Sequence, residues 1–331
     1  MKAIVYTEYG GPDVLRLQDV EKPAPKGNEV LVRVHAVSVN YGDLIARNFK
    51  NISTREFNMP LLFWLLARLS FGINTPKRKI LGNTFAGEIE MIGEDVKLFK
   101  KGDQVFGYTG EKMGTYAEYL GFPEKGIIAL KPTGLAFDEA ATIPYGTIMA
   151  LNLLRKAKIE KGQRVLIVGA SGGIGSAAVQ LAKHYFEADV TGVCSAQGFA
   201  YVKSLGADEV IDYKQEDFTK NGSTYDLIFD VLGKGTFSRY KKSLNKKGMY
   251  LLASFKLIKL LQMLLTAIIG EKKVVCAFAI PKPEDLIFIK ELIEAGKIKA
   301  SIDSCFPFEK TADAHRHAET ESKMGSVVIT M

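Results

Sequence analysis

The sequence has few of the residues that bind metal ions or form disulfides. Among its 331 residues are three cysteines, Cys194, Cys276 and Cys305, which lie far apart, and four histidines. No Cys-x-x-Cys or His-x-x-x-His pair is present, so the ligand spacings of a structural zinc site are missing. An odd number of scattered cysteines also argues against a disulfide-rich secreted fold and favours a reducing compartment.

Unbroken apolar runs long enough to cross a membrane are also lacking. Arg68 interrupts the apolar stretch at residues 59–72, and Lys256 and Lys259 interrupt the one at residues 251–270. Neither reaches the roughly 20 apolar residues that a transmembrane helix needs. The opening residues lack the basic and apolar regions of an export signal. We therefore predict no membrane span and a cytoplasmic location.

The overall composition is that of a soluble globular protein with room for two domains. The chain is 47% hydrophobic and 24% charged, with a formal net charge of +7. A basic surface suits anionic partners, and it equally suits a phosphorylated cofactor. Because no segment resembles a nucleic-acid-binding module, we expect no nucleic-acid partner.

The first third of the sequence has the pattern of a small, mostly-β domain. Short β-branched runs separated by glycine and proline occupy residues 2–7, 29–39, 86–92, 104–108 and 115–120. The pattern then changes to that of helices, with Asp138 as the expected helix cap and apolar residues at helical spacing over residues 148–156.

Strands and helices alternate through the next part of the chain, as in βαβ units. The pattern predicts strands at residues 164–168, 189–194, 209–211, 227–230, 249–253 and 274–278, and helices at residues 174–185, 199–205, 236–244 and 257–269. Six such strands form the doubly wound parallel sheet of a Rossmann domain. A helix at residues 285–295 and a strand at residues 326–330 have no place in that sheet, so we expect them to return to the first domain.

The turn after the first of these strands carries the most specific motif. Residues 169–175 read GASGGIG, in which Ala170, Gly172 and Gly175 take the three positions of the Gly-x-Gly-x-x-Gly fingerprint. Gly172 would let the backbone approach a pyrophosphate, and Gly175 would let the helix pack closely on the strand. The turn predicts a dinucleotide site, although alanine at the first position weakens the match.

The end of the second strand bears on which dinucleotide binds. About twenty residues after the turn, where NAD enzymes have an acidic residue, the sequence has Cys194 and Ser195. A serine hydroxyl can donate a hydrogen bond to a 2′-phosphate, whereas a carboxylate would repel it. We therefore predict NADPH as the cofactor, and NADH bound through other contacts stays open.

Four segments carry a family resemblance: VLIVGASGGIGSAAVQLAK, SLGADEVIDY, the opening MKAIVYTEYGGPDVLRLQDV, and SVNYGDLIARNF. Together they resemble the medium-chain dehydrogenase/reductase superfamily, and in particular its zinc-independent quinone oxidoreductase branch. The resemblance implies an α/β fold in which a Rossmann domain, residues 123–283, binds NADPH. It also implies a GroES-like substrate domain, residues 1–122 and 284–331, with the active site in the cleft between the two.

The positions that would bind zinc hold other residues. Zinc-dependent members of that superfamily have a cysteine at the position of Asn40 and a Gly-His-Glu motif near Gly82, where this chain has Asn83 and Thr84. Thiolate and imidazole are both missing, so we predict no metal ion. Without a Lewis acid, reduction of a quinone or α,β-unsaturated carbonyl is favoured over alcohol oxidation, because such an acceptor delocalises charge onto its own oxygen.

The resemblance places Asn40, Tyr41 and Asp43 beside the nicotinamide. It implies that Tyr41 is the proton donor, that Asn40 orients the substrate or the carboxamide, and that Asp43 is a buried acceptor behind them. A core position for Tyr41, and a turn or helix cap for Asp43, agree equally well with the sequence.

The resemblance also implies which residues contact the cofactor. They are Ser171, Gly173 and Ile174 for the diphosphate, Ser195 and Tyr213 for the 2′-phosphate, Val231 and Leu232 for the adenosine side, and Phe278 for the nicotinamide. Family members often have a lysine three residues beyond the serine; here that residue is Gly198, and Lys203 is a candidate substitute.

The two apolar stretches, residues 59–72 and 251–270, admit two interpretations. The first could wall a pocket for an apolar substrate, or the two could pack together as extra core or as the interface of a homodimer. Three functions stay open: NADPH-dependent reduction of a quinone or unsaturated carbonyl, a zinc-free NADP-dependent alcohol dehydrogenase, and an NADPH-binding protein without catalysis. The first agrees best with the residues.

Overall fold

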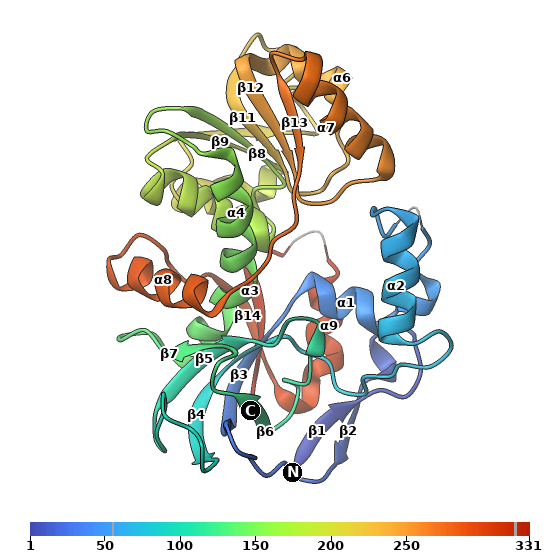
Figure 1. Cartoon of the computed structure of the whole chain (residues 1–331), viewed down its shortest axis with the longest axis vertical. Coiled ribbons are helices and arrows are strands. Elements are labelled where there is room, and N and C mark those ends of the chain that lie inside the picture. The colour runs from blue at the N-terminus through green and yellow to red at the C-terminus, as the bar shows by residue number, and fades with distance from the viewer. Residues whose placement is uncertain (55, 321–322) are drawn as a thin grey trace.

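The computed structural model describes residues 1–54, 56–320 and 323–331. Within them the strands form three sheets, and the two large sheets make up the upper and lower halves of the molecule (Figure 1).

The upper sheet has six parallel strands in the order β10-β9-β8-β11-β12-β13. The strands are β8 Arg164–Val168, β9 Asp189–Cys194, β10 Glu209–Asp212, β11 Tyr225–Asp230, β12 Leu244–Leu252 and β13 Lys273–Cys276. This order is that of two mononucleotide-binding halves, so the predicted Rossmann sheet is confirmed. Val165, Leu166 and Ile167 of β8 are fully buried, as expected for a central strand covered on both faces.

The helices of the upper half follow its strands. They are α4 Gly173–Gln180, α5 Phe199–Ser204, α6 Phe237–Tyr240 and α7 Leu257–Ile269. A π-helical turn, Leu181–Tyr185, completes the helix predicted at residues 174–185. The helix predicted at residues 236–244 is shorter than expected, because Leu244 already pairs with Tyr225 as the first residue of β12.

The lower sheet follows the order β14-β15-β3-β4-β5-β7, and β6 also pairs with β3. Its strands are β3 Glu29–Val39, β4 Thr84–Ile92, β5 Gln104–Tyr108, β6 Tyr119–Pro123, β7 Ile127–Leu130, β14 Ile302–Pro307 and β15 Ser326–Thr330. A separate antiparallel pair is formed by β1 Lys2–Val5 and β2 Arg16–Asp19. As expected, the last strand returns to the first sheet, where β15 pairs antiparallel with β3.

Two predictions about the lower sheet are wrong. β7 pairs with β5 in this sheet, although residues from 123 onward were assigned to the other domain. The four residues of β7 are too few to show the alternating pattern of a strand in the sequence. The strand predicted at residues 115–120 begins only at Tyr119, because Ala117 instead forms an isolated bridge with Ala3 of β1.

Helix α3, Phe137–Leu154, joins the two halves: it packs against β3, β4 and β5 below and against α4 above. The helix starts before Asp138, so the predicted cap is wrong. Glu139 instead accepts a hydrogen bond from the Ala136 amide at 2.9 Å, and this contact lies at the start of the helix. Pro144 lies inside the helix and is buried, and it removes one backbone donor there.

The remaining helices are α1 Tyr41–Arg47, α2 Leu61–Phe71, α8 Pro283–Glu294 and α9 Thr311–Ala318. α8 packs against α3 and β7, and α9 packs against β14 and β15. Within the described parts of the chain, no helix combines the length and the apolar character needed to cross a bilayer.

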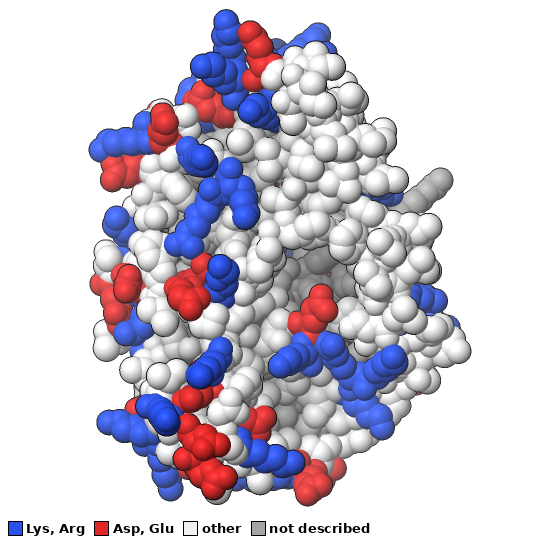
Figure 2. All heavy atoms as spheres, viewed as in Figure 1, with Lys and Arg blue, Asp and Glu red and all other residues white. Residues whose placement is uncertain are grey.

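Helices α2 and α7 expose their large apolar side chains. The prediction that the two stretches form extra core is wrong for these side chains, because they point to the surface. Figure 2 shows a broad surface without charged residues on this side of the molecule, with a hollow between its upper and lower parts. We call these exposed side chains the apolar face: Leu61, Leu62, Phe63, Leu65, Leu66 and Leu69 of α2, and Leu257, Ile258, Leu261, Leu264, Leu265, Ile268 and Ile269 of α7.

Candidate active site

The predicted dinucleotide turn lies between β8 and α4, at the carboxyl edge of the upper sheet. Gly169 has a φ of +87°, which glycine adopts without strain. Its carbonyl accepts the Gly172 amide at 3.2 Å, and the Ser176 amide donates to the Gly172 carbonyl at 2.8 Å. The amides that precede Ser176 lie in the first turn of α4, where a helix start presents N–H groups to an anion.

The left-handed residue of this turn is Gly169, one position before the residue that the fingerprint aligned first. Ala170 is fully buried, so its methyl group packs in the core and only its backbone belongs to the turn. The amides of Gly169 and Ala170 both donate to the Val193 carbonyl at 3.0 Å. Alanine at the first fingerprint position is therefore accommodated without strain.

Close packing fixes the turn from two sides and leaves it open on a third. A Cβ on Gly175 would lie 2.0 Å from the Gly169 carbonyl oxygen, and one on Gly146 of α3 would lie 2.3 Å from the Gly173 carbonyl oxygen. A Cβ on Gly173 would meet no atom within 4 Å. This open side fits a diphosphate. Sequence reasoning missed Gly146, whose one signal is its place just after Pro144 within a helix.

The predicted residues for the adenosine end follow neighbouring strands. Ser195 comes directly after β9, Tyr213 after β10, and Val231 and Leu232 after β11. Because the carboxyl ends of parallel strands meet at one edge, the strand order places these residues in a row on both sides of the turn. Leu232 lies against the turn itself, since a Cβ on Gly169 would be 3.2 Å from its side chain.

Lys203 does not replace the lysine that family members often have. Its ammonium donates to the Asp208 carbonyl, at the amino end of β10. Ser195 follows β9 and so lies at the carboxyl ends of the strands. Gly198 is packed tightly, because a Cβ there would lie 3.1 Å from the sulfur of Cys194 and 3.2 Å from the side chain of Ser171. Without Lys203, the hydroxyls of Ser195 and Tyr213 remain as the predicted contacts of the 2′-phosphate.

Phe278 follows β13 and reaches toward the lower half of the molecule. Its ring centroid lies 5.2 Å from that of Phe63 in α2 and 5.1 Å from that of Phe255. Next to this contact, the Asn58 side chain donates to the Leu232 carbonyl at 3.2 Å. The segment that leads into α2 thus closes one side of the hollow seen in Figure 2.

Asn40 and Asn83 are hydrogen-bonded to each other where zinc-dependent relatives would have ligands. The Asn40 amide nitrogen donates to Asn83 Oδ1 at 2.8 Å and to Ser38 Oγ at 3.1 Å. Zinc takes thiolate, imidazole or carboxylate ligands, so this pair of amides does not fit the ion. Across the described residues, His, Cys, Asp and Glu form no cluster of three or more that could hold a metal ion.

Asp43 is completely buried beneath the start of α1. Its Oδ2 accepts a hydrogen bond from the backbone N–H of Asn40 at 2.8 Å, and its Oδ1 accepts one from the backbone N–H of Gly82 at 3.1 Å. Burial raises the pKa of Asp43 to about 7, while these two amides and the Tyr116 hydroxyl oppose the shift. The carboxyl group thus acts as the helix cap that the sequence allowed, and it holds the backbone of Asn40 in place.

A buried polar chain continues from Asp43 to α9. Arg47 donates to His315 Nδ1 at 2.9 Å, so the other ring nitrogen, Nε2, carries the proton and donates to the Tyr116 hydroxyl at 3.1 Å. Burial and the Arg47 charge lower the pKa of His315 to about 3, so the ring is neutral. Arg47 also pairs with Glu319. Sequence reasoning missed this chain because its members lie up to 272 residues apart.

Tyr41, the first residue of α1, is 63% exposed, so the core position that the sequence allowed is wrong. Tyr145 of α3 and Tyr108 of β5 form a neighbouring pair, with ring centroids 6.2 Å apart. Contacts connect the start of α1 to this pair, because a Cβ on Gly42 would lie 3.3 Å from the Asn83 side chain and the Asn83 carbonyl accepts the Thr109 amide at 2.8 Å. Tyr145 in turn precedes Gly146, which touches the glycine turn, so α3 brings Tyr41 and the turn to one region.

Two family models match the chain in two separate regions. The alcohol dehydrogenase GroES-like domain matches residues 26–132, and the zinc-binding dehydrogenase model matches residues 205–329. The first agrees with the mostly-β lower sheet and the predicted GroES-like domain. The second bears the name of a metal that the Asn40 and Asn83 side chains do not fit.

Characterised relatives cover nearly the whole chain. A 2-methylene-furan-3-one reductase of Solanum lycopersicum is 32% identical over 99% of this chain and 79% of its own length. A chloroplastic NADPH-dependent alkenal/one oxidoreductase of Arabidopsis thaliana is 30% identical, with the same two coverages. A chloroplastic quinone oxidoreductase of Triphysaria versicolor is 31% identical over 99% of this chain and 98% of its own. Among solved structures, the quinone oxidoreductase of Coxiella burnetii superposes with a TM-score of 0.83 at 28% identity, covering 100% of this chain and 99% of that one.

Proposed function

Because this chain belongs to the medium-chain dehydrogenase/reductase superfamily, in its quinone oxidoreductase branch, we propose that it transfers hydride from NADPH to a quinone or an α,β-unsaturated carbonyl. The main observation in support is that α3 contacts the glycine turn through Gly146 and Tyr108 of β5 through Tyr145, and β5 leads to the Asn40–Asn83 pair that precedes Tyr41. A hydride donor and a hydroxyl donor can thus meet in one cleft. The names of two relatives, an alkenal/one oxidoreductase and a furanone reductase, support the same class of acceptor.

The cofactor fits the open side of the turn. The amides at the start of α4 would hold the diphosphate, and Ser195 and Tyr213 would hold the 2′-phosphate. When bound, the nicotinamide supplies the hydride. The chain itself would bind and orient the cofactor, on a turn whose backbone is fixed by the close contacts of Gly175 and Gly146.

The proton comes from the chain or from water. Desolvation, together with the Glu56 carboxylate, raises the pKa of Tyr41, so its hydroxyl stays protonated at neutral pH and can donate to the oxygen of the acceptor. Asn40 has its amide nitrogen bound to Asn83, and its amide oxygen is the atom that we assign to the carboxamide or the substrate. No step requires a metal ion, because a quinone or enone delocalises the charge that develops on its oxygen.

A panel of acceptors tests the proposed reaction. With NADPH as donor, we expect oxidation in the presence of quinones and enals, measured by loss of the nicotinamide absorbance. Turnover of alcohols alone would favour the second candidate, a zinc-free NADP-dependent alcohol dehydrogenase. Tight NADPH binding without hydride transfer to any acceptor would favour a non-catalytic protein. The cytoplasm remains the location that we propose, in agreement with three free cysteines.

We expect Tyr41→Phe to lower kcat by about 100-fold, because a positioned proton donor typically contributes at least that factor. NADPH affinity should stay unchanged, since the hydroxyl lies at the substrate end of the cleft. Steady-state kinetics and NADPH titration separate the two effects. Another tyrosine provides the control: Tyr9→Phe removes a hydroxyl that donates to the Phe71 and Gly72 carbonyls at the end of α2, and it should leave kcat unchanged. Equal rates for Tyr41→Phe and the wild type would remove Tyr41 as the donor.

We expect Ser195→Asp to reverse the cofactor preference. A carboxylate at the end of β9 repels a 2′-phosphate and accepts hydrogen bonds from ribose hydroxyls, so the ratio of NADPH to NADH affinity should fall by about 100-fold. The matched change Ser204→Asp, on an exposed residue of α5, should leave this ratio unchanged. Fluorescence titration with NADPH and with NADH measures this ratio of affinities. An unchanged ratio for Ser195→Asp would place the 2′-phosphate elsewhere.

A further inference from the structure

Helix α7 is apolar on its outward side as well as on the side that packs on the protein, where Leu260 and Met263 meet the core. Its inward side holds Lys259, whose ammonium donates to a backbone carbonyl at 2.6 Å, and Thr266, whose hydroxyl accepts a backbone amide at 3.0 Å. Its outward side carries leucine and isoleucine, and Ile268 and Ile269 are 83% and 81% exposed. A surface helix normally turns its apolar stripe to the core and its charges to solvent. The outward side of α7 therefore suits an apolar environment.

Helix α2 also turns apolar side chains outward, although Phe71 at its end packs on the core. Its Trp64 indole donates to the Ile52 carbonyl at 3.3 Å, and Arg68 donates to the Lys50 carbonyl at 3.1 Å, so these polar groups face the protein. The leucines of α2 face outward. Although α2 and α7 belong to different halves of the molecule, both lie on the same side of it, one on each side of the hollow (Figures 1 and 2).

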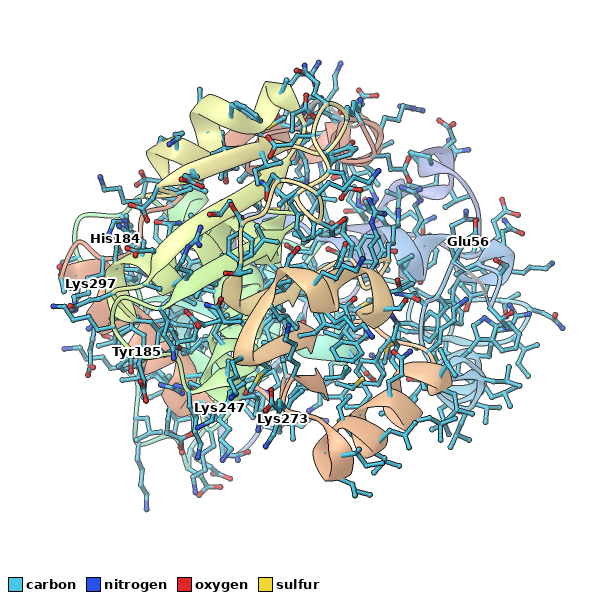
Figure 3. The ribbon with its side chains drawn as sticks, turned by 90° about the horizontal axis from the view of Figure 1, so that it is seen from above. Glu56, His184, Tyr185, Lys247, Lys273 and Lys297 are labelled. Carbon is cyan, nitrogen blue, oxygen red and sulfur yellow. The ribbon has the colours of Figure 1, made fainter. Side chains whose placement is uncertain are left out.

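The chain around the apolar face is strongly basic. Residues 231–283 contain eleven lysines and arginines and a single acidic residue, Glu271, and residues 57–87 contain four basic residues and no acidic one. The rest of the chain must be net acidic, because the whole carries only +7. Lys247 and Lys273 are exposed, and the view from above places them on the same side as α7 (Figure 3). Positive charge is therefore concentrated in the two segments of the chain that carry the exposed leucines and isoleucines.

We propose that the apolar face docks this protein on the surface of an anionic lipid bilayer. A helix with an apolar face and basic neighbours binds in the headgroup region, with leucines in the acyl chains and lysines at the anionic headgroups. The 13 residues of α7 extend over about 20 Å, less than the roughly 30 Å of a hydrocarbon core, so the helix lies in the interface and does not span it. This attachment is independent of the reaction in the cleft.

A second copy of the chain suits this face less well. In a symmetric dimer the same patch meets itself, so the basic residues beside α7 would approach those of the partner. Like charges at the edge of such an interface repel, whereas anionic headgroups pair with them. The charge on the two segments therefore favours a lipid surface.

Cosedimentation with vesicles tests the docking surface on the whole protein. Vesicles of phosphatidylcholine, with and without phosphatidylserine, are the probes. We expect binding to the phosphatidylserine vesicles, weakened by salt. The triple variant L265Q/I268Q/I269Q should lose at least about tenfold in partitioning, because three exposed apolar side chains no longer enter the bilayer. Lys247→Gln with Lys273→Gln should weaken binding to anionic vesicles only.

Three exposed apolar residues elsewhere on the protein provide the control. Leu17, Leu98 and Ile287 are exposed outside the apolar face, and L17Q/L98Q/I287Q should bind vesicles as the wild type does. Unchanged NADPH affinity in all variants shows that they are folded. Absence of vesicle binding, or equal loss in both triple variants, would overturn the proposal. So would a wild-type dimer, measured by sedimentation velocity, that L265Q/I268Q/I269Q converts to a monomer, because a second copy would then cover this face.

Discussion

Replacing Gly175 by alanine is expected to remove most NADPH binding and to lower thermal stability together. The new methyl group would lie 2.0 Å from the Gly169 carbonyl oxygen, which is backbone and cannot rotate away. Such overpacking typically costs about 1–3 kcal/mol, equivalent to a fall of about 2–4 °C in Tm for a chain of this size. The displaced turn would lose charge-assisted hydrogen bonds to the diphosphate, so we expect Kd to rise about 100-fold. Calorimetry and NADPH titration measure the two effects.

Gly173→Ala is the matched control on the same turn. Its methyl group would meet no protein atom within 4 Å, and alanine is a better helix former, so Tm should stay unchanged or rise slightly. NADPH binding should still weaken, because the methyl group enters the space that we assign to the diphosphate. Wild-type affinity in Gly175→Ala would show that the cofactor does not depend on this turn.

Arg47→Met is expected to be the most destabilising single change outside the turn. The guanidinium is almost fully buried, and it bonds the Gly10 carbonyl at 3.1 Å, His315 at 2.9 Å and Glu319. Glu319 reaches solvent, but His315 Nδ1 and the Gly10 carbonyl would each be left without a buried partner, which typically costs about 1–3 kcal/mol for each group. We expect Tm to fall by about 6 °C in a thermal unfolding scan.

Arg316→Met separates this buried network from an ordinary surface contact. Arg316 pairs with Asp13 and Asp313, but its side chain is half exposed. Exposed ion pairs contribute about 0–1 kcal/mol, so this variant should unfold within about 3 °C of the wild type. Equal destabilisation by both substitutions would mean that the Arg47 network has no special role.

The elements that the sequence predicted well are those whose pattern is local. Residues 165–168 form an unbroken apolar run because both faces of β8 are covered, and the strands at residues 164–168 and 189–194 both have the predicted bounds. The length of α7 was also predicted, but the side that it turns outward was not. The helical periodicity of the sequence locates the apolar stripe. It does not show whether the rest of the protein or another apolar medium covers that stripe.

The parts of the candidate site that were missed depend on contacts between distant segments. Gly146 touches the turn only because α3 crosses beneath it, and the sequence around Gly146 carries no dinucleotide motif. The buried position of Arg47 depends on His315, 268 residues further on. The exposure of Tyr41 likewise depends on the direction that α1 takes after β3, and no short sequence pattern predicts that direction.

The return of β15 to the first sheet has a consequence for synthesis on the ribosome. β3 has β15 as one of its neighbours, and Val327, Val328 and Ile329 of β15 are fully buried there. At roughly 5–20 residues per second, a gap of nearly 290 residues between these strands corresponds to about 15–60 s of translation. During that interval one edge of β3 is without its native neighbour in the nascent chain, while the upper sheet can already fold, so the two halves should mature in the reverse of their order in the sequence.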